Sequence, residues 1–159
     1  MTDAAINDSG LVTVEGAWNF QYRYFAGETA SRFFAELRDH GRIVGRRCPG
    51  CERVLVPARS YCDRCFLATT DWVTVGTEGV VETFTVLTAA FPGLPEPPLA
   101  IAYVTLDGAG TALLNFVAGL DLTDLDATAA LLLDRPRAEV VFHDDRHGRM
   151  TDFHFRVSP

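Results

Sequence analysis

The segment CPGCERVLVPARSYCDRC, residues 48–65, contains all four cysteines of the 159-residue chain, arranged as two Cys-x-x-Cys pairs. The ten residues between the pairs are enough for two antiparallel strands to leave one pair and return to the other. Turn-forming residues lie inside both pairs, Pro49 and Gly50 in the first and Asp63 in the second. Two such turns place four thiolates around one ion, and zinc is the ion that this ligand set favours. The predicted ligands of a structural zinc ion are Cys48, Cys51, Cys62 and Cys65.

A site with four thiolate ligands has no open coordination position, so its expected role is in folding rather than in hydrolysis. Metal ligation contributes on the order of 10 kcal/mol in small ribbons, and a segment of about 25 residues cannot build a core that folds without it. We therefore expect chelation to unfold the N-terminal half of the chain and to leave the C-terminal half largely intact. Iron in the same site stays open as an alternative to zinc. A thioredoxin-like redox pair fits poorly, because no βαβ pattern surrounds the cysteines.

The basic residues are concentrated around the cysteines. The net charge is −7 and the chain has no lysine, so all 14 basic residues are arginines. Eight of them lie between residues 32 and 64, and none lies between Cys65 and Asp134. Guanidinium groups suit phosphate, so this segment is a candidate site for a phosphorylated ligand, with a solvated surface as the alternative. The candidate contacts are Arg46, Arg47, Arg53, Arg59 and Arg64.

The overall composition is typical of a folded protein without a membrane segment. Hydrophobic residues make up 48% of the chain and charged residues 22%. No apolar run approaches the roughly 18 residues that span a bilayer, and the N-terminus lacks the basic and apolar regions of a signal peptide. We therefore expect a cytoplasmic protein with no membrane partner. The negative net charge argues against nucleic acid as a partner, because phosphate contacts drive that binding.

The pattern of residues predicts a mainly β protein in four parts. The parts are a flexible N-terminus (1–16), a helical segment (17–41), a rubredoxin-like zinc ribbon (42–70) and a C-terminal five-stranded OB-fold barrel (71–159). The ribbon is expected to contain two short strands, at residues 42–47 and 53–57.

Helical periodicity is clearest in the second half of residues 17–41. Thr29 is the expected N-cap and Gly41 the expected end of the helix. Phe33, Phe34 and Leu37 form one apolar face. The first half is rich in aromatic residues, which we expect to pack on this chain, with packing on a partner as the alternative. These aromatic residues are Trp18, Phe20, Tyr22, Tyr24 and Phe25.

Apolar runs after Trp72 predict five strands with a helix between the third and the fourth, which is the order of an OB-fold. The strands are expected at residues 79–90, 99–106, 111–120, 137–144 and 150–158, and the helix at residues 121–133 with Asp121 or Thr123 as its cap. The proline-rich loop 91–98 is either a simple strand connection or the lip of a pocket. Residues 143–149, with two histidines, are expected to form a polar turn.

The residues form no convincing catalytic set. If all four cysteines bind metal, no thiol is left as a nucleophile, and none of the four serines lies in a nucleophile-elbow setting. We find no paired carboxylates, no phosphate-binding glycine loop and no Ser/His/Asp set. The sequence therefore favours a binding or structural role over an enzyme.

Several motifs follow one another in an order that resembles a known family. They are YFAGETASRFFAELRDHG, RRCPGC, VPARSYC, CDRC, Trp72, GVVETFTV and PPLAIAYVTLDG. The series resembles bacterial and archaeal proteins in which a rubredoxin-like zinc ribbon is fused to an OB-fold, known as domain of unknown function thirty-five, over about residues 15–145. One departure is DATAALLLDRPRAEVVF (126–142), which stands where the family has a short glycine–methionine segment and is expected to remodel one barrel edge.

The resemblance implies a non-catalytic companion of a thiolase-like protein, such as a thiolase or a retro-aldolase of steroid or lipid side-chain degradation. Such a subunit stabilises a hetero-oligomer and helps to bind or pass acyl-CoA, whose phosphates are candidate ligands of the arginines. Carried over, the zinc ligands are the four cysteines, and Arg59 lies in the family's proline–arginine step. The alternatives are a nucleic-acid-binding zinc-ribbon/OB-fold module and a stand-alone acyl-CoA-binding protein.

Overall fold

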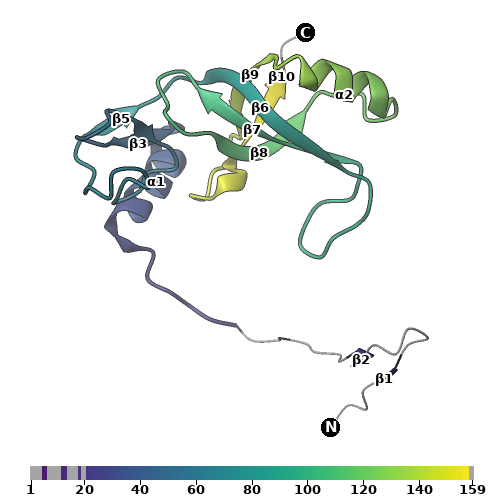
Figure 1. The fold of residues 1–159 in the computed structure, drawn as a ribbon, viewed down its shortest axis with the longest axis horizontal. Helices are drawn as coiled ribbons and strands as arrows, with labels where there is room; N and C mark the ends of the chain where they lie inside the picture. Colours follow the sequence, from purple (N-terminus) through teal and green to yellow (C-terminus); the bar gives the residue numbers. More distant parts are fainter. Residues whose placement is uncertain (1–4, 7–11, 14–17, 19–20, 158–159) are drawn as a thin grey trace.

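The computed structural model describes residues 5–6, 12–13, 18 and 21–157. It confirms a mainly β protein with one N-terminal helix, a ribbon carrying the four cysteines and a C-terminal OB-fold with a closed five-stranded sheet (Figure 1). The predicted flexibility of residues 1–16 falls mostly outside the described residues; within that range β1 (Ala5–Ile6) and β2 (Val12–Thr13) pair antiparallel. In the described part of the chain, no helix has the length and apolar character needed to cross a membrane.

The N-terminal helix, α1, covers Gly27–His40. It begins earlier than predicted, with Ala26 at the N-cap and no side-chain cap, so the prediction of Thr29 as the cap is wrong. The Thr29 hydroxyl instead hydrogen-bonds with that of Ser60 in the ribbon, 2.9 Å away. Gly41 ends the helix as predicted, with φ of 55°, a left-handed conformation that glycine adopts at little cost.

One side of α1 packs against the rest of the chain, as its apolar spacing predicts. Phe33 and Leu37 are buried and Phe34 is half-buried against the same core. Glu36 on this face is also buried, and its carboxylate accepts a hydrogen bond of 2.5 Å from Arg42. This hydrogen bond lowers the pKa of Glu36 by more than burial raises it. The carboxylate therefore stays charged on the buried face.

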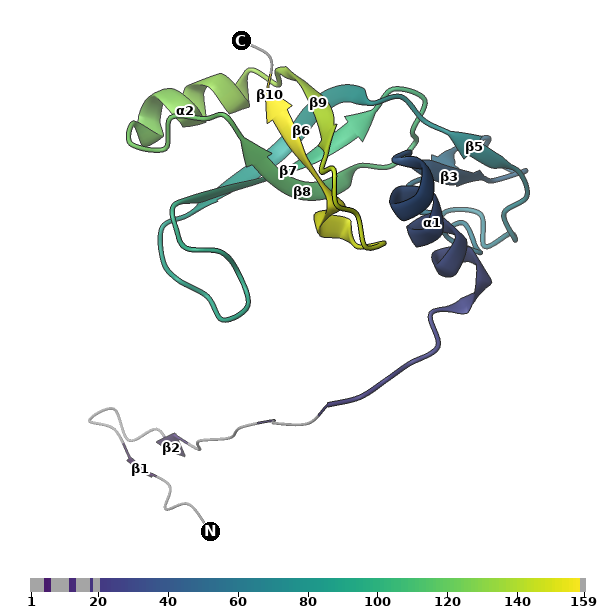
Figure 2. The same ribbon diagram turned by 180° about the vertical axis from the view of Figure 1, so that it is seen from behind.

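The aromatic residues before α1 do not pack as predicted. Trp18, Tyr22, Tyr24 and Phe25 are 72–93% exposed, and Phe20 lies outside the described residues. The chain leaves the N-terminus of α1 as an extended segment that points away from the ribbon and the barrel (Figure 2). The prediction that these rings are buried against their own chain is therefore wrong for the four described residues, although Tyr22 and Tyr24 contact each other with ring centroids 6.1 Å apart.

The ribbon sheet contains three short antiparallel strands in the order β4 (Val54–Leu55), β3 (Val44–Arg47) and β5 (Trp72–Thr74). β3 lies in the middle because Val44 pairs with Thr74 on one side and Arg47 with Val54 on the other. The ribbon sheet thus includes β5, which lies after the boundary predicted between the zinc ribbon (42–70) and the OB-fold (71–159). The domain boundary itself stays a prediction.

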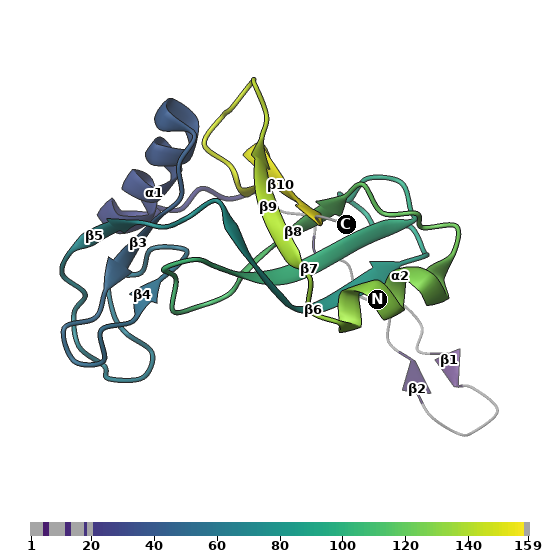
Figure 3. The ribbon, with the colours of Figure 1, turned by 90° about the horizontal axis from the view of Figure 1, so that it is seen from above.

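The barrel has the strand order expected of an OB-fold. Its strands are β6 (Glu78–Leu87), β7 (Leu99–Leu106), β8 (Leu113–Ala118), β9 (Arg137–Phe142) and β10 (Phe153–Val157). β6, β7 and β8 form an antiparallel meander, β10 pairs parallel with β8, and β9 closes the sheet between β10 and β6. A short helix, α2 (Leu125–Leu133), joins β8 to β9 and lies at the opposite end of the molecule from α1 (Figure 3).

The cap of α2 differs from the prediction. Asp124 is the N-cap and accepts a hydrogen bond of 2.9 Å from the Ala127 backbone N–H. The predictions of Asp121 and Thr123 are wrong because these two residues bond to each other: the Asp121 carboxylate accepts both the backbone N–H and the hydroxyl of Thr123.

The segment between β9 and β10 forms a polar turn, as predicted, followed by the short 3-10 helix η1 (Met150–Asp152). The buried Asp152 carboxylate accepts the backbone N–H groups of His147, Gly148 and Arg149. Arg146 donates to the Arg38 carbonyl, so this turn also contacts the end of α1.

One apolar core runs through both folded parts, and a smaller separate cluster contains Cys48, Leu55 and Cys62. Phe33 and Leu37 of α1 and Val54 and Val56 of the ribbon belong to the same buried cluster as the barrel interior, including Phe155. The ribbon and the barrel are therefore parts of one packed unit.

Candidate metal centre

The two cysteine pairs form two matching turns. In the first, the Glu52 N–H donates to the Cys48 carbonyl; in the second, the Phe66 N–H donates to the Cys62 carbonyl, both at 3.0 Å. Glu52 and Phe66 each follow the second cysteine of their pair, and both have a left-handed backbone, with φ of 59° and 55°. The matching backbone turns aim both thiols of each pair toward the same point.

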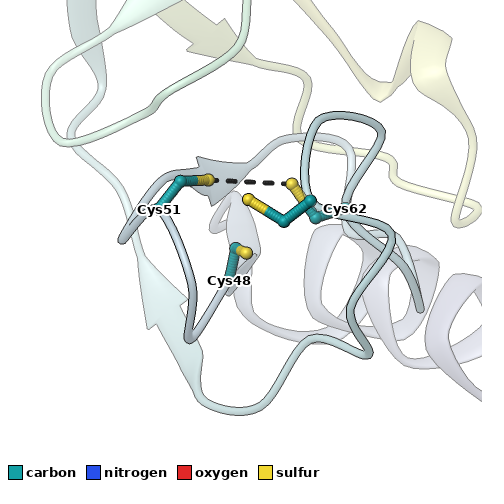
Figure 4. Close-up of side chains that lie close together, drawn as sticks. Cys48, Cys51 and Cys62 are labelled. Carbon is teal, nitrogen blue, oxygen red and sulfur yellow. Dashed lines mark hydrogen bonds between the residues drawn. The ribbon is translucent and has the colours of Figure 1, made fainter.

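The four sulfur atoms lie within 4.8 Å of one another (Figure 4). The Sγ atoms of Cys51 and Cys62 are 3.7 Å apart. A tetrahedral zinc ion with Zn–S bonds of about 2.3 Å places its sulfurs about 3.8 Å apart, so this spacing fits zinc. Cys48 and Cys62 are buried against Leu55, while Cys51 and Cys65 are partly exposed.

The thiols differ in how readily they lose a proton. The backbone N–H of Cys65 is the main cause that lowers the pKa of Cys62 to about 7, with burial opposing it. Hydrogen bonding to Cys51, together with burial, raises the pKa of Cys65 to about 12. Four thiolates this close repel one another, and a divalent cation removes that repulsion and binds the deprotonated form. The cluster therefore has the chemistry of a closed structural metal site.

Two of the five candidate arginines join separate parts of the chain. Arg46 lies with its guanidinium 5.0 Å from the Trp72 ring and donates to the Thr69 carbonyl. Arg53 donates to the Gly110 carbonyl in the loop between β7 and β8, and so joins the ribbon to the barrel. These contacts give both side chains a structural use within the chain.

The other three candidates are more open to solvent. Arg47 donates to the Glu52 carbonyl, and Arg59 lies 3.7 Å from the Asp63 carboxylate. Arg64 is exposed between the two cysteines of the second pair. Arg59 precedes the second cysteine pair and Arg64 lies within it, and these two are the most accessible of the five.

Sequence reasoning missed the partner of Trp72. Its half-buried ring is within cation–π distance of Arg32 from α1, at 4.4 Å, as well as of Arg46 from β3. This contact joins α1 to the ribbon sheet. The three residues are far apart in the sequence, and no local pattern links them.

The fold and the thiol cluster define a protein with a zinc ribbon followed by an OB-fold. Two family models match in that order: the rubredoxin-like zinc ribbon domain of ChsH2 at residues 35–70 and the C-terminal OB-fold domain of ChsH2 at residues 72–130. Together they span more than half of the chain. The protein belongs to this ChsH2-like zinc-ribbon/OB-fold family, as the sequence motifs implied.

Solved structures share the fold. A protein of unknown function from the DUF35 family of Sulfolobus solfataricus is similar with a TM-score of 0.58 and 22% identity, over 83% of this chain and 87% of that chain. A chain described as the Ltp2–ChsH2(DUF35) aldolase is similar with a TM-score of 0.58 and 19% identity, over 84% of this chain and 98% of that chain. A search of curated proteins gave no match.

Proposed function

We propose that this protein is a non-catalytic accessory subunit of a thiolase-like enzyme, either a thiolase or a retro-aldolase, in the breakdown of lipid or steroid side chains. The observation that carries the proposal is the match of both domains to ChsH2, together with the similarity to a chain from an Ltp2–ChsH2 aldolase. In this role the chain stabilises a cytoplasmic hetero-oligomer and helps the partner to bind or pass acyl-CoA.

Within this function, the four cysteines bind one structural zinc ion. The ligands are Cys48, Cys51, Cys62 and Cys65, whose sulfur cluster supports the assignment. The metal supplies folding energy and holds the two turns together, and the residues displayed on those turns meet the partner or its ligand. Metal analysis of the purified chain distinguishes zinc from iron.

Exposed aromatic residues support a protein partner. Four aromatic side chains project from the segment before α1, and Tyr61 and Phe66 are exposed on the ribbon. Aromatic residues are enriched at the centres of protein interfaces. The Thr29–Ser60 hydrogen bond places the start of α1 beside the ribbon loop that contains Tyr61, so both groups belong to the same end of the molecule.

Arg59 and Arg64 are the proposed contacts for the phosphates of coenzyme A. Replacing both by glutamine is expected to weaken binding of coenzyme A to the complex about tenfold or more, because two charge-assisted hydrogen bonds are lost. Arg135→Gln, at an exposed arginine of the barrel that also pairs with an acid, is the matched control. Equal affinity of the double variant and the control would remove these two residues from the proposal without affecting the partner.

A nucleic-acid-binding module is the second candidate function, because both folds bind nucleic acid in other proteins. The charge distribution disfavours it: β6, β7 and β8 contain neither lysine nor arginine. A salt titration of single-strand binding tests it directly. Binding that weakens steeply with salt would favour this function over the first.

The test of the main proposal is co-expression with a thiolase-like protein encoded beside this chain. We expect the two to co-purify and to elute together in size-exclusion chromatography, and the partner to lose solubility or activity when it is expressed alone. A partner that is fully active and soluble alone, and makes no contact with this chain, would overturn the proposal.

A further inference from the structure

The barrel contains a cavity that the sequence did not predict in detail. It has a volume of about 400 Å³ and lies where the loop between β6 and β7, the end of β8 and the start of β10 meet. That loop and the segment around η1 extend from the same side of the barrel (Figures 1 and 2). Pro95 and Pro98 line the cavity, so the proline-rich loop 91–98 forms the lip of a pocket, one of its two predicted roles.

The position of this cavity is the one that OB-folds use for ligands. In this fold, ligands bind on the face of the second and third strands, between the first-to-second and fourth-to-fifth strand loops. Here those strands are β7 and β8, which contribute Leu99 and Phe116, and the two loops contribute Pro98 and Thr151.

The lining of the cavity is apolar and carries no fixed charge. Nine of its twelve residues are apolar, including Phe116, Ala118, Leu122 and Phe153, and none is an aspartate, glutamate, lysine or arginine. An oligonucleotide needs cations along its backbone, which this lining lacks. Volume and lining instead match those of small-molecule sites, which combine an apolar wall with a few polar groups.

The polar groups of the cavity lie together. The rings of His143 and His154 are 5.2 Å apart between centroids, and both line the cavity together with Thr151. Burial, followed by the charges of His143 and Arg156, lowers the pKa of His154, so its imidazole is neutral at neutral pH. A neutral imidazole offers one N–H donor to a carbonyl or carboxylate oxygen.

We propose that this cavity binds the aliphatic chain of an acyl group, with the acyl oxygen at His143 and His154. The apolar wall holds the chain, and the imidazoles hydrogen-bond with the oxygen. A free carboxylic acid and an acyl thioester share this chemistry. If the ligand is the thioester, the inference rests on the proposed function, because the partner enzyme and this chain then bind the same acyl-CoA. If the ligand is the free acid, it does not.

The test is calorimetric titration of the full zinc-loaded chain, without a partner, with octanoate, octanoyl-CoA and coenzyme A. We expect octanoate, octanoyl-CoA or both to bind. Affinity should rise about fourfold for each methylene added between the butanoyl and octanoyl forms, which is the effect of burying one methylene. Binding of octanoate identifies the free acid as a source, and binding of octanoyl-CoA but not of octanoate identifies the thioester.

Variants that fill the cavity provide the structural control. Ala118→Phe, on the exposed end of β8, and Thr151→Phe, in η1, are each expected to weaken acyl binding at least tenfold. Ala130→Phe, at an exposed position of α2 outside the cavity, should leave it unchanged. Circular dichroism identifies a variant that is misfolded. If one of the two cavity-filling variants misfolds, the affinity of the other one is used for the test.

Three results would overturn the inference: no binding of either acyl ligand, equal binding of coenzyme A alone and octanoyl-CoA when octanoate does not bind, or unchanged affinity in both folded filled variants. None of these results concerns hetero-oligomer formation. Co-purification with the thiolase-like partner is measured separately, so failure of the cavity assignment and failure of the proposed function give different results.

Discussion

Asp152 is the residue on which the connection between β9 and β10 most depends. The residue is 3% exposed, and its carboxylate accepts three backbone N–H groups, which outweigh burial and lower its pKa. We expect Asp152→Ala to reduce the free energy of unfolding at pH 7 by roughly 3 kcal/mol, because three backbone donors lose a charged and buried acceptor. Asp144→Asn, at an exposed acid of the same connection, is the control for urea denaturation.

The same carboxylate gives a prediction about pH. Because the pKa of Asp152 is lower in the folded than in the unfolded chain, its contribution is complete above the unfolded value of about 3.9 and is lost as pH falls below it. The stability difference between the wild type and Asp152→Ala should therefore shrink between pH 5 and pH 2 (roughly one unit above and two below that value). A difference that stays constant over this range would contradict the role given to the charge.

Phe66 combines a left-handed backbone with a side chain that is 83% exposed. A left-handed conformation costs an L-residue roughly 1–2 kcal/mol, and asparagine tolerates it better than phenylalanine. We expect Phe66→Asn to raise the free energy of unfolding by up to about 1 kcal/mol in thermal denaturation. Tyr61→Asn, at an exposed aromatic residue of the same loop with ordinary backbone, should not stabilise the protein, and equal effects would refute the explanation by strain.

At this scale, spacing was enough to predict the thiol cluster but not the use of the arginines. Two Cys-x-x-Cys pairs restrict the geometry locally, whereas the contact of Arg46 with Trp72 depends on the pairing of β3 with β5. An arginine that binds its own chain and one that is free for a ligand have the same local sequence signal.

The secondary-structure elements were predicted more accurately than their ends. The end of α1 at Gly41 could be predicted because the left-handed backbone of this glycine depends only on local geometry. Thr29 is not the cap because its hydroxyl bonds with Ser60, which only the tertiary fold brings near. In the same way, the sequence offered Asp121 and Thr123 as caps of α2, but these two residues bond to each other and Asp124 is the cap.

The contact between the ribbon and the barrel provides a test at the scale of elements. The Thr111 hydroxyl accepts from the Val56 N–H at 2.8 Å and donates to the Val56 carbonyl at 2.7 Å, and Val56 is fully buried. Thr111→Val is expected to cost roughly 1–3 kcal/mol, because both buried backbone groups lose their partner. Thr74→Val, at an exposed position of β5, is the isosteric control in chemical denaturation. Equal stability of the two variants would show that this hydroxyl does not join the parts.

At the scale of the whole molecule, the continuous core changes the expectation for metal removal. The sequence suggested that the barrel survives chelation, but residues of α1, the ribbon and the barrel share one buried cluster. The metal contributes on the order of 10 kcal/mol, comparable with the 5–15 kcal/mol that stabilise a typical domain. We therefore expect chelation to reduce amide hydrogen-exchange protection in β6–β8 as well as in the ribbon, and zinc to restore it. Unchanged protection of these strands would support the original expectation.

The most direct test of the central claim is native mass spectrometry of the chain co-expressed with a candidate thiolase-like partner. It determines the subunits and the metal in one measurement. The account predicts a hetero-oligomer in which each copy of this chain carries one zinc ion. A spectrum that shows this chain only on its own, with its zinc bound and the partner separate, would contradict it.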